Sequence, residues 1–177
     1  MHIRAARDQD FKACLVLDLT YETELAWQMS EIVGEGEWGA HFREVRLPRK
    51  QKITPAYPPE TRLKAWERRD GFWVALDQRK LLGFVAVSLE FDHYQARITD
   101  LGVAADHRRQ GVATDMLNHV IEWCARSEVS QLIFECPPKA QPAIGFALKH
   151  HFVFCGFQDV YWPDQTTVLF FRKRLRG

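Results

Sequence analysis

The sequence lacks any apolar run near the roughly 18 residues that a membrane-spanning helix needs. Its first ten residues, MHIRAARDQD, are too polar for a signal peptide. Net charge is also missing, because 24 Lys and Arg against 23 Asp and Glu leave +1. That balance offers no general attraction to nucleic acid or to a membrane surface. We therefore expect a cytoplasmic protein that binds neither.

Cysteine is scarce, and no pair is spaced as CxxC or as a metal site. The four residues, Cys14, Cys124, Cys136 and Cys155, lie far apart, so we expect reduced, mostly buried thiols and no bound metal. Repeats and low-complexity tracts are absent as well. What remains is ordinary for a globular chain, and a length of 177 residues fits one domain, residues 1–177.

The apolar pattern changes its period along the chain and predicts both helices and strands. We expect strands at 3–5, 72–76, 82–90, 97–104, 131–136, 152–154 and 167–172, and helices at 11–21, 111–126 and 143–150. Residues 22–70 are rich in Gly and Pro and are expected to form helix pieces and loops that elaborate the domain. The order predicts a mixed α+β or α/β fold with a central, mostly antiparallel twisted sheet flanked by helices.

The most informative segment runs from Asp100 to Leu117, DLGVAADHRRQGVATDML. A strand enters a loop with two arginines and a glycine, and an amphipathic helix follows. The backbone N–H groups of 109–113 would lie unpaired at a helix N-terminus, which suits a pyrophosphate. Gly111 permits close approach, and Arg108 and Arg109 would add charge-assisted hydrogen bonds. The segment is neither a P-loop nor GxGxxG. Alone, it is also compatible with an ordinary helix start and solvated arginines.

Arg108-x-x-Gly111-x-Ala113 is similar to the R/Q-x-x-G-x-G/A signature of the GNAT superfamily of N-acetyltransferases, which bind acetyl-CoA. The likeness extends over about residues 72–175 and includes the segment AIGFALKHHF at 143–152. More narrowly, DLGVA-x-D-x-RR and KHHF resemble streptothricin acetyltransferases. The resemblance implies a GNAT-like domain whose splayed strands hold acetyl-CoA. It also implies transfer of the acetyl group to a primary amine of a small acceptor by direct attack on the thioester.

The resemblance also assigns cofactor contacts. The backbone of Leu101 and Val103 would pair with the pantetheine arm, and the loop at 108–114 would hold the pyrophosphate. The full expected set is Leu101, Gly102, Val103, Arg108, Arg109, Gln110, Gly111, Val112, Ala113 and Thr114. The thioester would lie where the strand at 98–104 splays from the strand at 131–136.

Two departures affect the acid that the family often uses to protonate the leaving thiolate. The family tyrosine falls at Ala147 and the asparagine at Ala140. A coenzyme thiol has a pKa near that of free cysteine, about 8.5, so its thiolate leaves tolerably without help. Losing a general acid slows a reaction by roughly 10²–10⁴-fold. Tyr94 and Tyr161 are candidate substitutes. The departures leave open a second function, a catalytically weak acyl-CoA-binding or sensing module.

The candidate catalytic bases are Asp100, Glu90 and His93. Asp100 precedes the cofactor-binding residues, and strand alternation puts its side chain on the face opposite Leu101. A hydrogen-bonded structural carboxylate is the alternative for Asp100, and a solvated turn is the alternative for Glu90 and His93.

The acceptor side has one compositional signal. Residues 13–42 contain no Lys or Arg but six acidic residues, Asp18, Glu22, Glu24, Glu31, Glu35 and Glu37. Trp27 and Trp38 are interleaved with them, and carboxylates beside aromatic faces suit a cationic amine. We therefore expect a small cationic acceptor that contacts Trp27, Glu31 and Trp38. A solvated acidic face is the alternative. The oligomeric state stays open, with a homodimer among the options.

Overall fold

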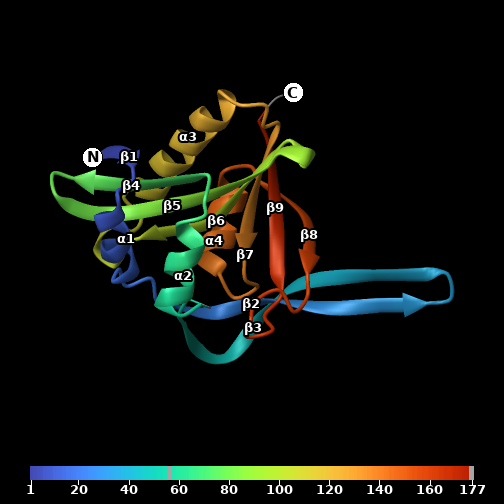
Figure 1. The fold of residues 1–177 in the computed structure, drawn as a ribbon. Helices are drawn as coiled ribbons and strands as arrows, with labels where there is room; N and C mark the ends of the chain where they lie inside the picture. The colour runs from blue at the N-terminus through green and yellow to red at the C-terminus, as the bar shows by residue number, and fades with distance from the viewer. Residues whose placement is uncertain (56, 176–177) are drawn as a thin grey trace.

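The computed structural model describes residues 1–55 and 57–175 (Figure 1). Two short 3-10 turns, η1 (Phe91–His93) and η2 (Ala105–His107), flank the sixth strand. In chain order the strands and α-helices are β1 (His2–Ala5), α1 (Asp8–Leu15), β2 (Tyr21–Gly34), β3 (Glu37–Ile53), α2 (Pro59–Trp66), β4 (Gly71–Asp77), β5 (Lys80–Glu90), β6 (Gln95–Val103), α3 (Val112–Ala125), β7 (Gln131–Cys136), α4 (Gln141–Lys149), β8 (Val153–Gln158) and β9 (Val168–Arg174).

Seven strands form one sheet in the order β1-β4-β5-β6-β7-β9-β8. All neighbours are antiparallel except β6 and β7, which run parallel and are joined through α3. This confirms the predicted mixed sheet flanked by helices. Within the described residues, no helix is long and apolar enough to cross a bilayer.

The two faces of the sheet carry different helices, and strand β5 shows how alternation divides them. Val85 and Val87 point into the larger core, which includes residues of α3 and α4. Phe84 and Ala86 point the other way, into a smaller core with Cys14 of α1 and Trp66 of α2. The face under α1 and α2 is the nearer one in Figure 1.

Strands β6 and β7 separate part-way along their length. Their pairing ends at Ile98 opposite Phe134, whereas β6 stays paired with β5 as far as Val103 opposite Gly83. A register shift at the Ala86/Val87 position accompanies the separation. The stretch 99–103 therefore has a backbone edge on the β7 side that no strand covers.

Residues 22–70 differ from the prediction of helix pieces and loops. Strands β2 and β3 form a long antiparallel hairpin, and α2 is the helix of this stretch. The turn lies between Gly34 and Glu37, and Gly36 takes a φ of +73° there. The alternation that marks a strand is weak in this sequence, because many positions on both faces are charged. Cross-strand pairing, which is non-local, fixes these strands.

The first helix is also shorter than predicted. It ends at Leu15 instead of near Tyr21, and Asp18 then accepts hydrogen bonds from the backbone N–H and the hydroxyl of Thr20. The helix begins after Arg7, its N-cap residue, and Asp10 in its first turn accepts from the Arg7 N–H at 2.7 Å and from Arg4.

Candidate active site

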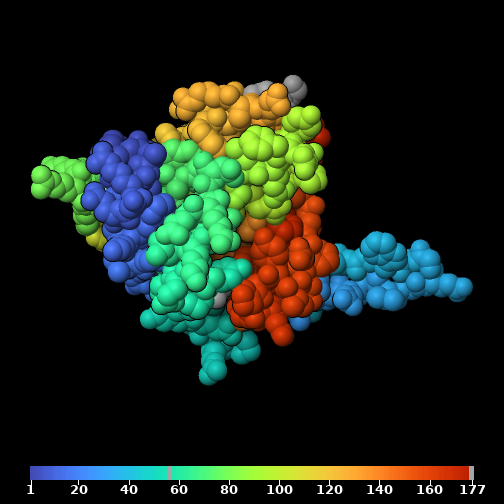
Figure 2. All heavy atoms as spheres, in the orientation of Figure 1, coloured from blue at the N-terminus to red at the C-terminus, as the bar shows by residue number. Residues whose placement is uncertain are grey.

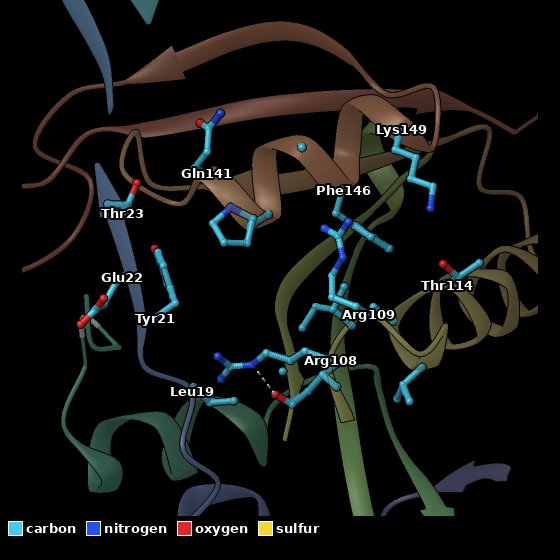
Figure 3. A pocket seen from close by; sticks show the side chains of 18 of the residues that line it. Leu19, Tyr21, Glu22, Thr23, Arg108, Arg109, Thr114, Gln141, Phe146 and Lys149 are labelled. Carbon is cyan, nitrogen blue, oxygen red and sulfur yellow. Dashed lines mark hydrogen bonds between the residues drawn. The ribbon is translucent and has the colours of Figure 1, made fainter. Parts of the chain in front are cut away.

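A cavity of about 1150 Å³ lies between the free stretch of β6, the start of α3, the length of α4 and the first residues of β2 (Figure 3). It is therefore built by segments that are distant in sequence. Of the predicted cofactor contacts, the cavity is lined by Leu101, Gly102, Val103, Arg108, Arg109, Gly111, Val112, Ala113 and Thr114. Gln110 is not among the lining residues, and its side chain donates to the Asp106 carbonyl at 2.9 Å.

The loop before α3 has the geometry of an anion site. Gly111 has a φ of +91°, and a Cβ added there would meet no atom within 4 Å. Asp115 is the first helical residue whose N–H reaches a carbonyl four residues back, that of Gly111 at 3.0 Å. The N–H groups of 112–114 therefore have no such partner within the helix and lie at its positive end. A phosphate group fits this arrangement.

Two cationic side chains line the cavity near the start of α3. Arg109 leaves the loop with a φ of +63°, and Lys149 comes from α4 (Figure 3). Neither side chain makes a hydrogen bond or ion pair with another residue that the structure describes. Lys149 was not predicted as a cofactor contact, although it lies in the family-like segment at 143–152. Thr114 Oγ1 lies 3.1 Å from His150 Nε2, and burial followed by the charge of Lys149 lowers the pKa of His150.

Arg108 does something that the sequence did not indicate. Its guanidinium donates to three backbone carbonyls: Val103 at 3.2 Å, Thr20 at 2.8 Å and Asp18 at 2.7 Å. The side chain thus ties the cofactor loop to the segment that leads into β2. Its cationic group is directed to these carbonyls and not to the anion site, where we had predicted a phosphate contact for it.

Packing around β6 requires a glycine at position 102. A Cβ at this position would lie 2.7 Å from an edge carbon of Phe84 and 2.9 Å from a methyl of Leu19. Among the described residues, β6 has no strand partner on the β7 side here, so the backbone of 101–103 can bond an extended chain, except at the Val103 carbonyl, which accepts from Arg108.

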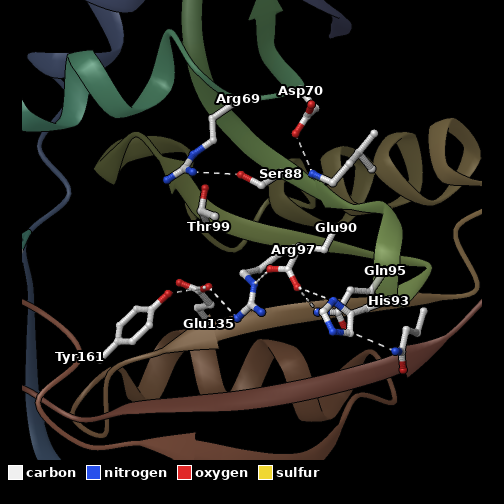
Figure 4. Close-up of polar contacts among 12 residues, drawn as sticks. Arg69, Asp70, Ser88, Glu90, His93, Gln95, Arg97, Thr99, Glu135 and Tyr161 are labelled. Carbon is white, nitrogen blue, oxygen red and sulfur yellow. Dashed lines mark hydrogen bonds and ion pairs between the residues drawn. The ribbon is translucent and has the colours of Figure 1, made fainter.

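Asp100 and Glu135 lie on the other face of the sheet, beside the point where the strands separate. Neither belongs to the cavity lining. The side chain of Glu135 is only 5% exposed and accepts from Arg97 and from the Tyr161 hydroxyl, both at 3.1 Å (Figure 4). Burial raises the pKa of Glu135 and that of Asp100, against the opposing effects of Arg97 and of the Thr99 hydroxyl. Sequence reasoning missed Glu135.

The other predicted acid–base residues are placed elsewhere. Glu90 accepts from Arg97 Nε at 2.7 Å, and this contact holds its pKa below the usual value, which makes it a poor base. His93 lies in η1, and its Nδ1 is 3.9 Å from the carboxylate of Glu90, the last residue of β5. Tyr161 donates to Glu135, and burial and that carboxylate raise its pKa to about 12. Tyr94 is exposed in a left-handed conformation after η1. None of the four lines the cavity.

The predicted acceptor contacts are also not brought to the cavity. Glu31 and Trp38 lie on the outer part of the β2–β3 hairpin, and Trp38 is 89% exposed. The Trp27 N–H donates to the Pro138 carbonyl at 2.9 Å, where the hairpin crosses the body. Of the acidic residues in 13–42, Glu22 and Glu24 do line the cavity, and Glu24 pairs with Arg46 at 3.0 Å.

Tyr21 is a cavity residue that sequence reasoning missed. It is the first residue of β2, directly after Thr20, and Figure 3 shows it reaching into the cavity with its hydroxyl on the side of α4. The hydroxyl makes no hydrogen bond with any described residue. Burial, followed by nearby Cys136, raises its pKa to about 12. It was overlooked because 11–21 read as a helix.

The alanines at the family's acid positions are buried. Ala147 is fully buried in the larger core, and Ala140 precedes α4 and is 4% exposed. Neither lines the cavity. At the glycine position of the family-like segment, His151 has a φ of +62°, so the turn keeps its left-handed backbone.

Comparison with known proteins identifies the family. Residues 40–152 match the model of the acetyltransferase (GNAT) family. The chain belongs to this family. This confirms that the Arg108-x-x-Gly111-x-Ala113 segment was correctly recognised as the signature of this family.

Comparison with individual proteins gives more specific likenesses than the family model does. The chain is 32% identical over 90 residues to streptothricin acetyltransferase A of Bacillus subtilis (strain 168); the match spans 51% of each chain, about half the length of that relative. The structure is similar to a nourseothricin acetyltransferase, with TM-score 0.83, 21% identity and 98% of both chains covered. It is also similar to a Bacillus anthracis str. Ames protein solved in complex with acetyl coenzyme A, with TM-score 0.74, 14% identity, and 98% and 96% of the chains covered. These likenesses to solved structures show the fold.

Proposed function

We propose that the protein transfers the acetyl group of acetyl-CoA to an amine of a small cationic acceptor of the streptothricin class. The observation that carries the donor half is the single cavity that contains both the uncovered backbone edge at 101–103 and the loop around Gly111. The edge suits the extended pantetheine arm, and the loop, Arg109 and Lys149 suit the phosphates. The acceptor class is supported by the named function of the Bacillus subtilis relative.

The acceptor amine must lose a proton as it attacks, and two carboxylates are placed to help. Asp100 on β6 and Glu135 on β7 lie beside the point where the two strands separate, on the face of the sheet opposite α3. A base works best when its pKa lies close to the working pH, and burial moves both pKa values in that direction. Glu90 is a poorer candidate for this role, because hydrogen bonds from Arg97 and Gln95 hold its pKa below the usual value. On the cavity side, Glu22 supplies a carboxylate toward a cationic acceptor.

A hydrogen-bond donor would speed departure of the thiolate, and Tyr21 is the tyrosine among the described residues that line the cavity. A hydroxyl with a pKa of about 12 stays protonated at neutral pH, so it is always available as a donor. The nitrogen–carbon bond forms, the carbon–sulfur bond breaks, and the electron pair leaves on sulfur, where Tyr21 stabilises it. The proton that completes the thiol comes from water.

Release of free thiol from acetyl-CoA tests the proposal. The purified protein is assayed with streptothricin, an aminoglycoside, a polyamine and a peptide, and mass spectrometry locates the acetyl group. We expect turnover with streptothricin. Turnover only with another amine would overturn the acceptor class. Binding of acetyl-CoA without turnover of any amine would favour the sensing module, and no binding at millimolar acetyl-CoA would overturn the whole proposal.

A further inference from the structure

A hydrogen bond joins the start of helix α3 to the end of helix α4. Oγ1 of Thr114, in the first turn of α3, lies 3.1 Å from Nε2 of His150, the residue that follows α4. Both helices pack on the face of the sheet away from α1 and α2, which cover the nearer face in Figure 2. Thr114 lines the cavity and His150 does not, so the histidine reaches the cavity through the threonine.

The His150 side chain is fixed by its surroundings. Its ring packs on that of Phe146, with centroids 4.4 Å apart and planes inclined by 50°. Its backbone carbonyl accepts from Lys173 Nζ of β9 at 2.9 Å, and its backbone N–H bonds to the Phe146 carbonyl at 3.1 Å. Ring and backbone are both anchored, and Nε2 is left directed at the Thr114 hydroxyl. A side chain that is already ordered loses little entropy when a ligand comes to depend on it.

The Thr114 hydroxyl carries a single hydrogen, so it donates to one partner at a time. If that hydrogen points to the imidazole, the hydroxyl presents only lone pairs to the cavity, and lone pairs repel an anion. If Nε2 carries the hydrogen of this contact and donates to Oγ1, the hydroxyl hydrogen is released to point into the cavity. An anion in the cavity therefore favours the second arrangement.

A phosphate of acetyl-CoA is the anion that suits this place. The backbone N–H of Thr114 is one of the three at the start of α3 that have no carbonyl partner within the helix. Lys149, which precedes His150 in the chain, also lines the cavity. A phosphate that accepts from these N–H groups can also accept from the hydroxyl of Thr114, because both donors belong to one residue.

We propose that His150 is a positioning residue for the cofactor: its Nε2–H donates to Thr114 Oγ1 and so turns the threonine hydroxyl hydrogen toward a phosphate of acetyl-CoA. The donors follow one another from imidazole to hydroxyl to phosphate oxygen, and no covalent bond changes. The inference rests on the donor half of the proposed function, the binding of acetyl-CoA in this cavity. It does not depend on the class of acceptor.

A pH dependence of binding follows, because an anion favours a protonated imidazole. In the free protein, burial lowers the pKa of His150, and the charges of Lys149, Lys173 and His151 lower it further. A bound phosphate opposes these cations and raises the pKa. Affinity should therefore rise as the pH falls from above the bound pKa to below the free one. His107 also lines the cavity, so the effect is read from variants at position 150, in which His107 is unchanged.

Isothermal titration of the full chain with dephospho-CoA tests the hydrogen bond. This probe keeps the ionised pyrophosphate and lacks the 3′-phosphate, whose second pKa of about 6 would add its own pH dependence. His150→Leu removes the donor and keeps an apolar contact with Phe146, and it should weaken binding about 10-fold. His151→Asn is the matched control, since asparagine tolerates the φ of +62° at this exposed position. It should bind like the wild type.

A conservative variant separates the donor from the charge. His150→Gln keeps an N–H donor that does not titrate. It should keep most of the affinity, and its affinity should rise less than that of the wild type between about pH 8 and about pH 6. A wild-type affinity in His150→Leu would overturn the inference, and so would a His150→Gln profile as steep as that of the wild type. The second measurement decides the question if the leucine variant does not fold, which circular dichroism shows.

A double-variant cycle tests whether His150 acts through Thr114. Thr114→Val removes the hydroxyl with little change of shape, and Thr114→Ser, which keeps a hydroxyl, is its control. In a Thr114→Val protein, His150→Leu should cost no further affinity. Additive losses would overturn the inference and leave the proposed function intact. Failure of the wild type to bind both acetyl-CoA and dephospho-CoA would overturn the proposed function itself, so the two failures are distinguishable.

Discussion

Arg108 holds Thr20: its Nη1 donates to the Thr20 carbonyl at 2.8 Å across 88 positions of sequence. The arginine that opens the family signature thus fixes the residue directly before Tyr21. Because Arg108 makes this bond, the loop before α3 also fixes the position of the backbone from which Tyr21 reaches into the cavity. The loop before α3 and the segment that leads into β2 are therefore held together.

The first prediction is that Arg108→Lys destabilises the protein, although the charge is kept. A lysine ammonium cannot reach the carbonyls of Val103, Thr20 and Asp18 together. Losing one or two of these bonds should lower the free energy of unfolding by about 1–3 kcal/mol, measured with urea. Arg79→Lys, in the exposed β4–β5 turn, is the control and should change it little. Equal stability of the two variants would mean that the three carbonyl contacts contribute nothing.

The second prediction concerns the anion site. Gly111→Asp should abolish binding of acetyl-CoA in isothermal titration, because it places a negative charge where we expect the pyrophosphate. The apo fold has room for the side chain, but the φ of +91° strains any other residue there. Gly36→Asp, at a φ of +73° in open space on the β2–β3 hairpin, matches that strain away from the cavity. Unchanged affinity of the Gly111 variant would place the anion site elsewhere.

The third prediction isolates Tyr21. Tyr21→Phe removes one oxygen and should lower kcat by roughly 10-fold to 100-fold, less than the 10²–10³-fold typical of an oxyanion donor because sulfur is a weaker acceptor. Affinity for acetyl-CoA should be kept. A readout without turnover is the thiol pKa of bound CoA, followed by thiolate absorbance, which should rise in the variant. Tyr94→Phe is the control, and a bound-thiol pKa equal in both proteins would remove Tyr21 from the mechanism.

The fourth prediction is a pH dependence of stability. Arg4 and the Arg7 N–H hold the pKa of Asp10 below its usual value. A depressed folded pKa adds stability above the unfolded value of about 3.9, and this stability is lost as the pH falls through the folded pKa. Asp10→Asn should therefore destabilise the protein at pH 7, and its difference from the wild type should become smaller at about pH 3 in thermal unfolding. An equal difference at both pH values would exclude the ion pair as the cause.

The sequence predicted the seven-stranded sheet and the glycine loop that opens α3 well, because both depend on local patterns. Strand 131–136 and the helix after Gly111 are marked by short-range periodicity and by a glycine with a required conformation. What it could not show is which distant segments meet. Tyr21 and Lys149 come to the cavity through the crossing of β2 and the docking of α4. Glu135 lies on the other face of the sheet, beside the point where β6 separates from β7. The acidic run in 13–42 was correctly noticed, but the register of the β2–β3 hairpin places three of its six residues, Glu31, Glu35 and Glu37, at the outer end of the hairpin.

The last prediction concerns Ala147, where the family often has tyrosine. From the sequence alone, Ala147→Tyr is expected to raise kcat if the phenol fits and to overpack the site if it does not. The structure favours overpacking, because Ala147 is fully buried in the core with Ile144 and Phe152. Ala147→Tyr should therefore lower the free energy of unfolding by about 1–3 kcal/mol.

A matched variant separates crowding from chemistry at α4. Phe146 lines the cavity one residue earlier, and Phe146→Tyr adds a phenol oxygen there without adding a ring. We expect it to keep wild-type stability, measured by urea unfolding beside Ala147→Tyr, with no gain in kcat while Tyr21 is present. If Ala147→Tyr instead keeps full stability and acetyl-CoA affinity and raises kcat, position 147 faces the sulfur when CoA is bound. The proposal that Tyr21 donates to the leaving sulfur would then have to be tested again, because a phenol at position 147 would be placed to donate to the same atom.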